Sequence, residues 1–203
     1  MAGQDPYASR QVNARDPKKF DPARAHVLDA AEREAYLPTA ELIELLDLDA
    51  VEHVVDYGAG TGSLALAVAE ELGERGRVVA IDESREMFER LSQRVSGVAG
   101  VEALLIAENR VPLDDGWAQR IVALNLMHEI RGETALAEMR RLLAPGGYVL
   151  VVDWERGRDR EFGPPDELLY SREEAEAELR GAGLRADPVN AALPYHFAVK
   201  GRA

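Results

Sequence analysis

A short apolar run at residues 53–57 leads directly into three glycines at alternate positions, Gly58, Gly60 and Gly62. Glycine adopts backbone conformations that other residues avoid, so this spacing predicts a tight turn that a ligand can approach closely. Residues 63–72 follow with apolar side chains at helical spacing. A strand, a glycine turn and a helix in this order predict a ligand site at the amino end of the helix.

The same alternation of apolar runs and helical stripes continues along the chain. The predicted strands are residues 77–82, 101–106, 120–125 and 148–154, and the predicted helices are residues 84–95, 132–143 and 171–182. Unbroken apolar runs are typical of strands that helices cover on both faces, as in parallel sheets. We therefore predict an α/β fold with a Rossmann-like, doubly wound sheet.

Both ends of the chain depart from this pattern. Residues 194–200 alternate apolar and polar side chains, which predicts a last strand with one partly solvated face in an antiparallel edge hairpin. Asp-Pro pairs punctuate the first 22 residues, and residues 23–36 have the spacing of a short amphipathic helix. We divide the chain into an N-terminal arm and cap helix, residues 1–36, and one domain, residues 37–203.

The amino-acid composition limits the kinds of partner and metal site that the chain can have. The 203 residues carry a net charge of −13, which disfavours a nucleic-acid partner, and the few cations near Lys19 are an ordinary solvated run. The absence of cysteine excludes disulfides and thiolate metal sites, and we predict no metal. No apolar run approaches the roughly 18 residues of a membrane span. We expect a cytoplasmic protein without a membrane partner, and a homodimer is left open.

Asp56 stands at the end of the first strand, just before the glycine turn. A carboxylate there would repel the pyrophosphate of a dinucleotide, but it attracts the ammonium and sulfonium of S-adenosylmethionine. The spacing is G-x-G-x-G, with Ser63 in the place of the third glycine of the dinucleotide fingerprint. The alternative is that Asp56 only binds backbone amides at the strand end.

Two further strand ends carry polar side chains. Asp82 ends the second strand, at the spacing where an acid of a Rossmann fold accepts the ribose hydroxyls. The alternative for Asp82 is that it caps the helix that begins near Ser84. Glu108 and Asn109 follow the third strand and are predicted to bind an adenine edge, with an ordinary polar loop as the alternative.

The segments DYGAGTG, VVAIDES, AEN, LNLMHEI and LAPGGYVLVVDW together resemble the class I S-adenosylmethionine-dependent methyltransferases. More narrowly they are similar to the small-molecule group that includes the ubiquinone and menaquinone C-methyltransferases. The resemblance covers residues 37–200. It implies a three-layer αβα fold whose seven strands lie in the order 3-2-1-4-5-7-6, with strand 7 antiparallel.

The resemblance also implies S-adenosylmethionine as the cofactor. Asp56, Gly58 and Gly60 would line its methionine part, Asp82 would bind the ribose, and Glu108 would lie beside adenine, where many relatives have aspartate. Neighbouring residues complete the predicted cofactor set: Tyr57, Ala59, Gly62, Glu83, Met87, Asn109 and Asn125.

Methyl transfer is an in-line displacement that needs a positioned acceptor and, where the acceptor is protonated, a base. His128 is the candidate base, and Glu129 would orient its ring or hold a cationic substrate. The alternative is that His128 packs or caps the next helix. Tyr36, Trp154 and Tyr195 are candidate substrate walls, with a core or rim position as the alternative.

Some methyl acceptors are disfavoured. The segment from Asn125 to His128 differs from the Asn-Pro-Pro-Tyr type of base- and glutamine-methylating enzymes, and cytosine C5 and arsenite methylation rely on cysteines. A small molecule methylated at oxygen, nitrogen or carbon remains. Two rival functions stay open: a catalytically silent protein that binds S-adenosylmethionine or S-adenosylhomocysteine, and an NAD-dependent oxidoreductase.

Overall fold

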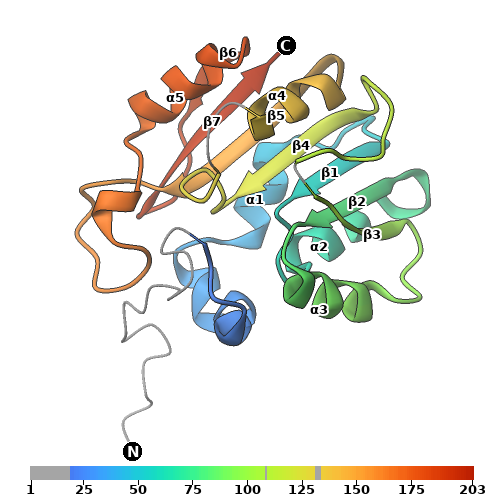
Figure 1. Cartoon of the computed structure of the whole chain (residues 1–203), viewed down its shortest axis with the longest axis horizontal. Helices are drawn as coiled ribbons and strands as arrows, with labels where there is room; N and C mark the ends of the chain where they lie inside the picture. Colours follow the sequence, from blue (N-terminus) through green and yellow to red (C-terminus); the bar gives the residue numbers. More distant parts are fainter. Residues whose placement is uncertain (1–18, 108, 131–133) are drawn as a thin grey trace, which may run out of the picture.

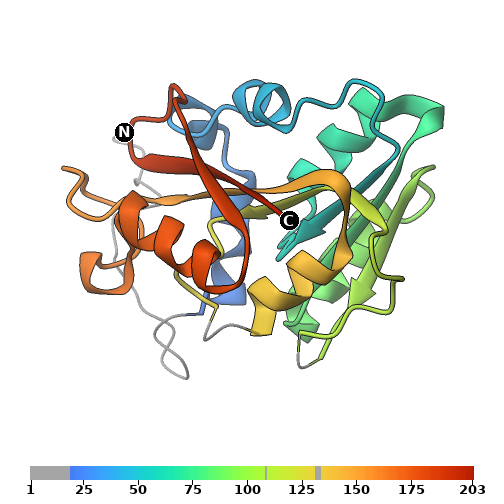
Figure 2. The ribbon, with the colours of Figure 1, turned by 90° about the horizontal axis from the view of Figure 1, so that it is seen from above.

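The computed structural model describes residues 19–107, 109–130 and 134–203. In these residues one seven-stranded sheet has the order β3-β2-β1-β4-β5-β7-β6, with helices on both of its faces (Figures 1 and 2). The strands are β1 His53–Tyr57, β2 Arg77–Asp82, β3 Val101–Leu105, β4 Ala118–Leu124, β5 Leu143–Trp154, β6 Arg185–Val189 and β7 His196–Arg202. The predicted strand order and three-layer architecture are confirmed.

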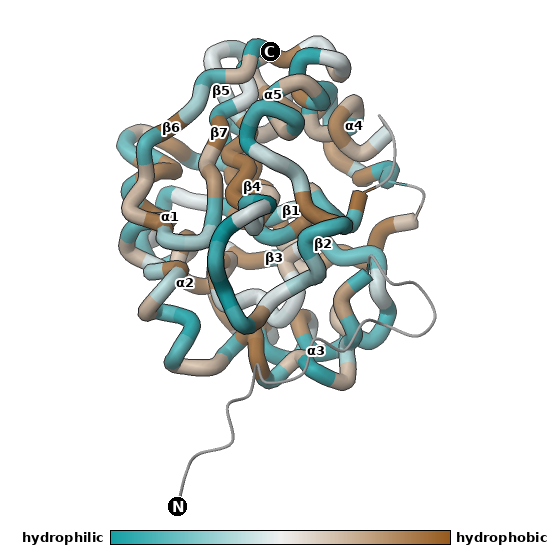
Figure 3. The backbone as a smooth tube through the Cα atoms, turned by 90° about the vertical axis from the view of Figure 1, so that its left-hand side faces the viewer, coloured by the Kyte–Doolittle hydropathy of each residue, from teal (hydrophilic) through white to brown (hydrophobic). Residues whose placement is uncertain are grey.

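The α-helices are α1 Thr39–Leu46, α2 Ser63–Leu72, α3 Arg85–Val95, α4 Thr134–Leu142 and α5 Arg172–Gly181. Short 3₁₀ helices are η1 Pro22–Asp29, η2 Ala31–Ala35, η3 Gly73–Arg75 and η4 Asp166–Leu168. Helices α1, α2 and α3 pack on one face of the sheet, and α4 and α5 pack on the other. Figure 3 shows the hydrophobic backbone stretches of β1 and β4 inside a more hydrophilic periphery.

Strands β1 to β5 pair in parallel, and β7 runs antiparallel to both β5 and β6. Successive strand residues enter opposite layers of the core: Val54 contributes to the α1–α3 side and Val55 to the α4–α5 side. This two-sided burial is the reason for the unbroken apolar runs in the sequence.

Local sequence sets several element boundaries. The predicted limits of β1, α2 and β2 are confirmed at both ends. Ser84 caps α3 by accepting a hydrogen bond from the Met87 amide (3.4 Å), and Ser171 and Glu174 form the predicted capping box of α5.

The predicted cap helix at residues 23–36 is wrong in type, because η1 and η2 are 3₁₀ helices separated by the extended residue Ala30. Asp29, at the end of η1, accepts hydrogen bonds from the hydroxyls of Thr61 (2.8 Å) and Ser63 and from the Arg94 guanidinium (2.5 Å). These tertiary bonds interrupt the helical run, since they hold the end of η1 against the glycine turn and α3. The arm, residues 1–18, lies outside the described residues.

The prediction of a half-solvated last strand is also wrong. His196, Phe197, Ala198 and Val199 are all buried, because β7 lies between β5 and β6 rather than at the edge. The edge strand on this side of the sheet is β6, and its Asp187-Pro188 pair suits an edge position, where a missing amide hydrogen costs no ladder bond. None of the helices in the described ranges is long and apolar enough to cross a membrane.

Candidate active site

A cavity of about 1060 Å³ opens where the parallel strands end. Its walls include Asp56 from β1, Asp82 from β2, Leu124 from β4 and Trp154 from β5, each at the carboxyl end of its strand. Residues 19–36 and the loop after β5 close it from outside, on the side of the sheet where β4 ends (Figure 1). Ligands of open α/β sheets bind at this end.

The glycine turn forms the floor of the cavity. Gly58, Gly60 and Gly62 all have positive φ (79°, 56° and 83°), and the amides of Gly58 and Ala59 both donate to the Ile81 carbonyl at 2.9 Å. Gly62 does not line the cavity. A Cβ there would lie 2.5 Å from Leu91 Cδ1, so Gly62 serves the close approach of α2 to α3.

Asp56 is only 2% exposed, and no hydrogen-bond partner of its Oδ2 lies within the described residues. Burial and the nearby Asp82 carboxylate raise the pKa of Asp56 to about 7. A buried acceptor without a partner is costly, and a cationic ligand in the cavity would satisfy it. This is the feature expected where an ammonium or sulfonium binds.

Asp82 is held by backbone amides. Its Oδ2 accepts from the Gly60 amide (3.0 Å) and its Oδ1 from the Ser84 amide (2.8 Å), so the carboxylate bridges the glycine turn and the start of α3. Each oxygen keeps acceptor capacity for a ligand hydroxyl. Glu83 and Met87 also line the cavity, and Lys19 pairs with Glu83 at 2.5 Å.

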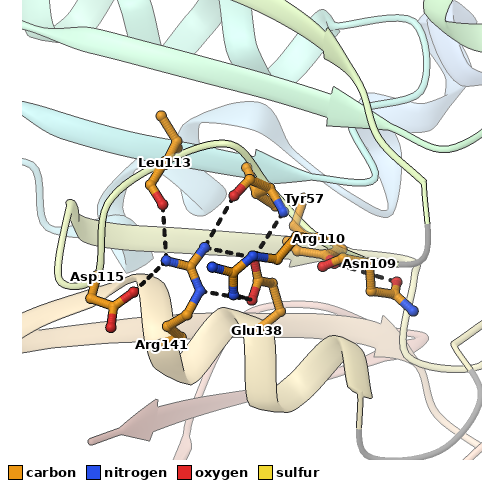
Figure 4. A network of polar contacts seen from close by, with 8 residues as sticks. Tyr57, Asn109, Arg110, Leu113, Asp115, Glu138 and Arg141 are labelled. Carbon is orange, nitrogen blue, oxygen red and sulfur yellow. Dashed lines mark hydrogen bonds and ion pairs between the residues drawn. The ribbon is translucent and has the colours of Figure 1, made fainter.

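A polar network anchors the loop after β3 (Figure 4). Glu138 of α4 accepts from the Val111 amide (2.8 Å), and Arg141 of α4 donates to Glu138 (2.6 Å) and to the Leu113 carbonyl (2.9 Å). Asn109 lines the cavity, and its carbonyl accepts from the Tyr57 hydroxyl at 3.3 Å. The predicted residue Glu108 lies outside the described residues.

His128 and Asp153 form a buried pair at the ends of β4 and β5. His128 Nδ1 lies 2.8 Å from Asp153 Oδ1 and 3.0 Å from Oδ2, and the His128 amide donates to Oδ2 at 2.9 Å. Burial disfavours the imidazolium, but the Asp153 carboxylate outweighs burial, so the pKa of His128 is raised. The remaining ring nitrogen, Nε2, lies 3.9 Å from Glu129 Oε1.

Glu129 lines the cavity beside His128. Burial raises its pKa to about 7, although the His128 and Lys19 charges and a hydrogen bond with the Phe20 backbone oppose the rise. Asn125, at the end of β4, also lines the cavity and has a positive φ of 52°. No partner of its buried Oδ1 lies within the described residues, so this oxygen is another acceptor for a ligand.

Aromatic rings form the wall next to His128. Tyr36 lies 5.6 Å from Trp154 and stacks on His196 at 6.1 Å, and Trp154 lies 4.3 Å from His196. Tyr36 and Trp154 line the cavity, whereas Tyr195 packs behind them and does not. His196 is also outside the lining, and burial lowers its pKa to about 3.

The structure therefore brings together most of the predicted site residues, with Gly62 and Tyr195 outside the lining. Sequence reasoning assigned no role to Arg33, which also lines the cavity, and did not pair His128 with Asp153. A signal for Asp153 was present: it ends an apolar strand as Asp56 and Asp82 do. Arg33 has no such signal, because it lies inside the helix predicted at residues 23–36 and not at the end of a strand.

Comparison with known proteins identifies the family. A crystal structure of a SAM-dependent methyltransferase from Aquifex aeolicus is 31% identical, with a TM-score of 0.83 over 90% of this chain and 98% of that one. The chain belongs to the S-adenosylmethionine-dependent methyltransferases. The family model described as "Methyltransferase domain" matches residues 54–147. The predicted resemblance and the cofactor, S-adenosylmethionine, are confirmed, and the oxidoreductase alternative is set aside.

Other relatives agree with this assignment. The ubiquinone/menaquinone biosynthesis C-methyltransferase UbiE of Cupriavidus metallidurans is 36% identical over 108 residues, 52% of this chain and 44% of that protein. The match thus spans less than half of that curated relative. Human N-acetylserotonin methyltransferase, solved with SAM, shares the fold at 18% identity, with a TM-score of 0.67 over 90% of this chain and 56% of that one.

Proposed function

We propose that this chain transfers the methyl group of S-adenosylmethionine to an oxygen, nitrogen or carbon atom of a small molecule by in-line displacement, with His128 as general base. The observation that carries the proposal is the His128–Asp153 pair. Asp153 engages Nδ1 at 2.8 Å, which leaves Nε2 as the free ring nitrogen beside Glu129 in the cavity wall.

The residues that would hold the cofactor, here called the cofactor cradle, lie at or near the carboxyl ends of the strands. Asp56 would attract the ammonium of the methionine part, Asp82 would accept the ribose hydroxyls, and Asn109 would lie beside adenine. When bound, S-adenosylmethionine supplies an electrophilic methyl group on its sulfonium. The unpartnered Asp56 Oδ2 and Asn125 Oδ1 fit such a polar, cationic ligand. Further cradle residues would be Tyr57, Gly58, Ala59, Gly60, Glu83 and Met87.

Asp153 holds a proton on His128 Nδ1, so the lone pair of the neutral ring lies on Nε2. Nε2 can then take the proton of an acceptor hydroxyl, amine or activated carbon. The raised pKa of His128 increases its basicity, and the nearby Asp153 stabilises the imidazolium that forms. Glu129, 3.9 Å from Nε2, adds a second carboxyl that stabilises the same charge.

The acceptor would lie against the apolar wall of the cavity. Tyr36, Trp154, Leu126, Pro164 and Leu168 line this part. We assign residues 19–36 as the cap of a domain that spans residues 37–203, since Phe20, Val27 and Leu28 of that segment also line the cavity. A closed apolar wall excludes water from the reaction.

Turnover tests the proposal directly. The protein is incubated with S-adenosylmethionine and a metabolite panel, and S-adenosylhomocysteine formation is measured. The panel includes carbon acceptors of ubiquinone and menaquinone biosynthesis because of the UbiE relatives. His128→Ala should lower turnover about 10²-fold or more, because it removes the base, with S-adenosylhomocysteine affinity intact.

His26→Ala, at an exposed position of η1, is the matched control and should keep normal turnover. Normal turnover of His128→Ala would assign His128 to packing instead. Tight cofactor binding without turnover on any acceptor would favour a catalytically silent binding protein.

A further inference from the structure

Two carboxyl groups flank the candidate base. Asp153 Oδ1 lies 2.8 Å from Nδ1 of His128, and Glu129 Oε1 lies 3.9 Å from Nε2 of the same ring. Only 2% of the Asp153 side chain and 14% of the Glu129 side chain are exposed. Because burial strengthens electrostatic interactions, both carboxyls act strongly on a group that binds beside the ring.

The cations near this pair are engaged by other carboxylates. Lys19 forms an ion pair with Glu83 at 2.5 Å, and Arg160 forms one with Asp166 at 2.8 Å. The cavity is also lined by two cap arginines whose charges are not among those that act most on the base and on the carboxyl beside it, Arg24 and Arg33. Among the described residues, the surroundings of the base are therefore negative in balance.

This negative balance discriminates among the acceptor atoms that the proposed function leaves open. A phenolate or enolate nucleophile carries a negative charge, which neighbouring carboxylates disfavour. An amine is neutral when it attacks and gains positive charge as the methyl group is transferred. Carboxylates beside the nitrogen stabilise that charge, so they favour a nitrogen acceptor.

The geometry also favours a group with several N–H donors. The 3.9 Å between His128 Nε2 and Glu129 Oε1 is too long for a direct hydrogen bond. One donor atom about 2.9 Å from each would fit between them. A hydroxyl has one hydrogen and can serve only one of these two acceptors, whereas an amine or ammonium can serve both.

A third acceptor lies in the same turn of chain. Asn125 Oδ1 is buried, and no partner for it lies within the described residues. The turn is closed by the Glu129 amide, which donates to the Leu126 carbonyl at 2.8 Å. Asn125, His128 and Glu129 all line the cavity. An ammonium group, with three N–H donors, can match three acceptors.

We propose that the methyl acceptor is a basic amine, with Glu129 and Asn125 accepting its N–H groups and His128 removing one proton. This inference rests on the proposed function and narrows its acceptor. The different segment from Asn125 to His128 does not oppose it, because the amino groups of nucleobases and of glutamine are not basic.

The proposed reaction balances in charge and atoms. The ammonium loses one proton to Nε2 of neutral His128, which becomes an imidazolium. The nitrogen lone pair forms a bond to the methyl carbon as the carbon–sulfur bond breaks, and the sulfur keeps the electron pair of that bond. The products are S-adenosylhomocysteine and a methylated ammonium, and His128 then releases its proton to solvent.

The test uses pairs of probes that differ in one functional group. Phenethylamine, tryptamine and hexylamine are each compared with the alcohol of the same skeleton. Isothermal titration of the protein saturated with S-adenosylhomocysteine measures binding, and S-adenosylhomocysteine formation from S-adenosylmethionine measures turnover. At least one amine should bind about 10-fold or more tighter than its alcohol and be methylated, because the alcohol leaves buried acceptors without a donor.

Glu129→Gln sharpens the result. It should weaken binding of that amine roughly 10- to 100-fold, because charge-assisted hydrogen bonds are lost, and leave alcohol binding within about 2-fold. Glu129→Asp should recover part of the loss, because it restores the charge. Glu161→Gln removes an exposed acid from the loop after β5, outside the cavity lining, and should change neither affinity.

The outcomes separate this inference from the proposed function. Amine binding that depends on Glu129, without turnover on any acceptor, would reject the proposed function and support amine recognition. Turnover confined to hydroxyl or carbon acceptors would support the proposed function and overturn the amine. Absence of amine binding, equal binding of amine and alcohol, or equal weakening of both by Glu129→Gln would also overturn it.

Discussion

The two halves of the cavity are built in different ways. In the cofactor half, the turn at residues 58–62 and Asp82 are held by backbone amides within β1, β2 and the starts of their helices. In the acceptor half, the decisive contacts join side chains far apart in the sequence. His128 meets Asp153 across 25 positions, and Tyr36 stacks on His196.

Because of this difference, cofactor binding and the methyl-transfer step should depend on different residues. Backbone amides and glycines make a rigid shape that local sequence dictates, so changes there should alter cofactor affinity. Buried side-chain pairs set protonation states, so changes there should alter turnover and pH dependence. A cofactor-half mutation that changes only turnover, or an acceptor-half mutation that changes cofactor affinity, would contradict this comparison.

The largest effect is expected for Asp153→Asn. The amide keeps the shape of the side chain but removes the charge that raises the pKa of His128, and it replaces one of the two acceptor oxygens beside Nδ1–H with a donor. Turnover should fall about 10²-fold, because the base is no longer oriented. His128 must be neutral to accept a proton, so a lower pKa moves the acidic limb of the pH–rate profile to lower pH.

The profile is measured for wild type, Asp153→Asn and Asp159→Asn, an exposed position in the loop after β5 that should change neither quantity. A loss of turnover with an unmoved acidic limb would mean that Asp153 acts on local folding rather than on His128. Loss of S-adenosylhomocysteine affinity would contradict the separation of the two halves.

The contrast also explains what could be predicted from sequence. The limits of β1, α2 and β2 were predictable because apolar spacing and glycines act within a few residues. The places of Asp56 and Asp82 in the cavity lining were predictable because each lies at the carboxyl end of a parallel strand, where ligands of such sheets bind.

Other features depend on contacts that no local pattern contains. The cap forms η1 and η2 instead of one helix because Asp29 binds Thr61 and Arg94. The burial of β7 follows from β6, whose Asp187-Pro188 pair gives no strand signal. The pairing of His128 with Asp153 requires β4 and β5 to be neighbours, which spacing alone does not show.

An intermediate effect is expected for Asp82→Ala, which tests the cofactor half. Loss of a charged acceptor for the ribose hydroxyls should weaken S-adenosylhomocysteine by roughly 1–3 kcal/mol in isothermal titration. Turnover at saturating cofactor should stay near that of wild type. Glu89→Ala, at an exposed position of α3 outside the cavity lining, is the control. Unchanged affinity would mean that another residue binds the ribose. Loss of the acidic limb of the pH–rate profile in this variant would show that the cofactor half and the acceptor half of the cavity influence each other.

The smallest expected effect is on the pH dependence of stability, and it distinguishes the two histidines of the acceptor half. His128 has a carboxylate partner and a raised pKa, whereas His196 is 4% exposed, has no described partner for either ring nitrogen, and has a pKa lowered to about 3. His196 is therefore neutral in the folded chain and takes up a proton on unfolding below its ordinary pKa of 6.5. Its contribution to stability is present above that pH and declines as the pH falls toward 3.

His196→Phe keeps an aromatic ring against Tyr36 and Trp154 but removes this titration. Relative to wild type, its free energy of unfolding should rise by about 1–2 kcal/mol between pH 7.5 and pH 5. Urea unfolding at both pH values measures the difference, with His26→Phe as the exposed control. A constant difference would show that His196 gains a proton or a partner in the folded state. A pH-dependent difference would assign His196 to packing and leave His128 as the titrating group that faces the cavity.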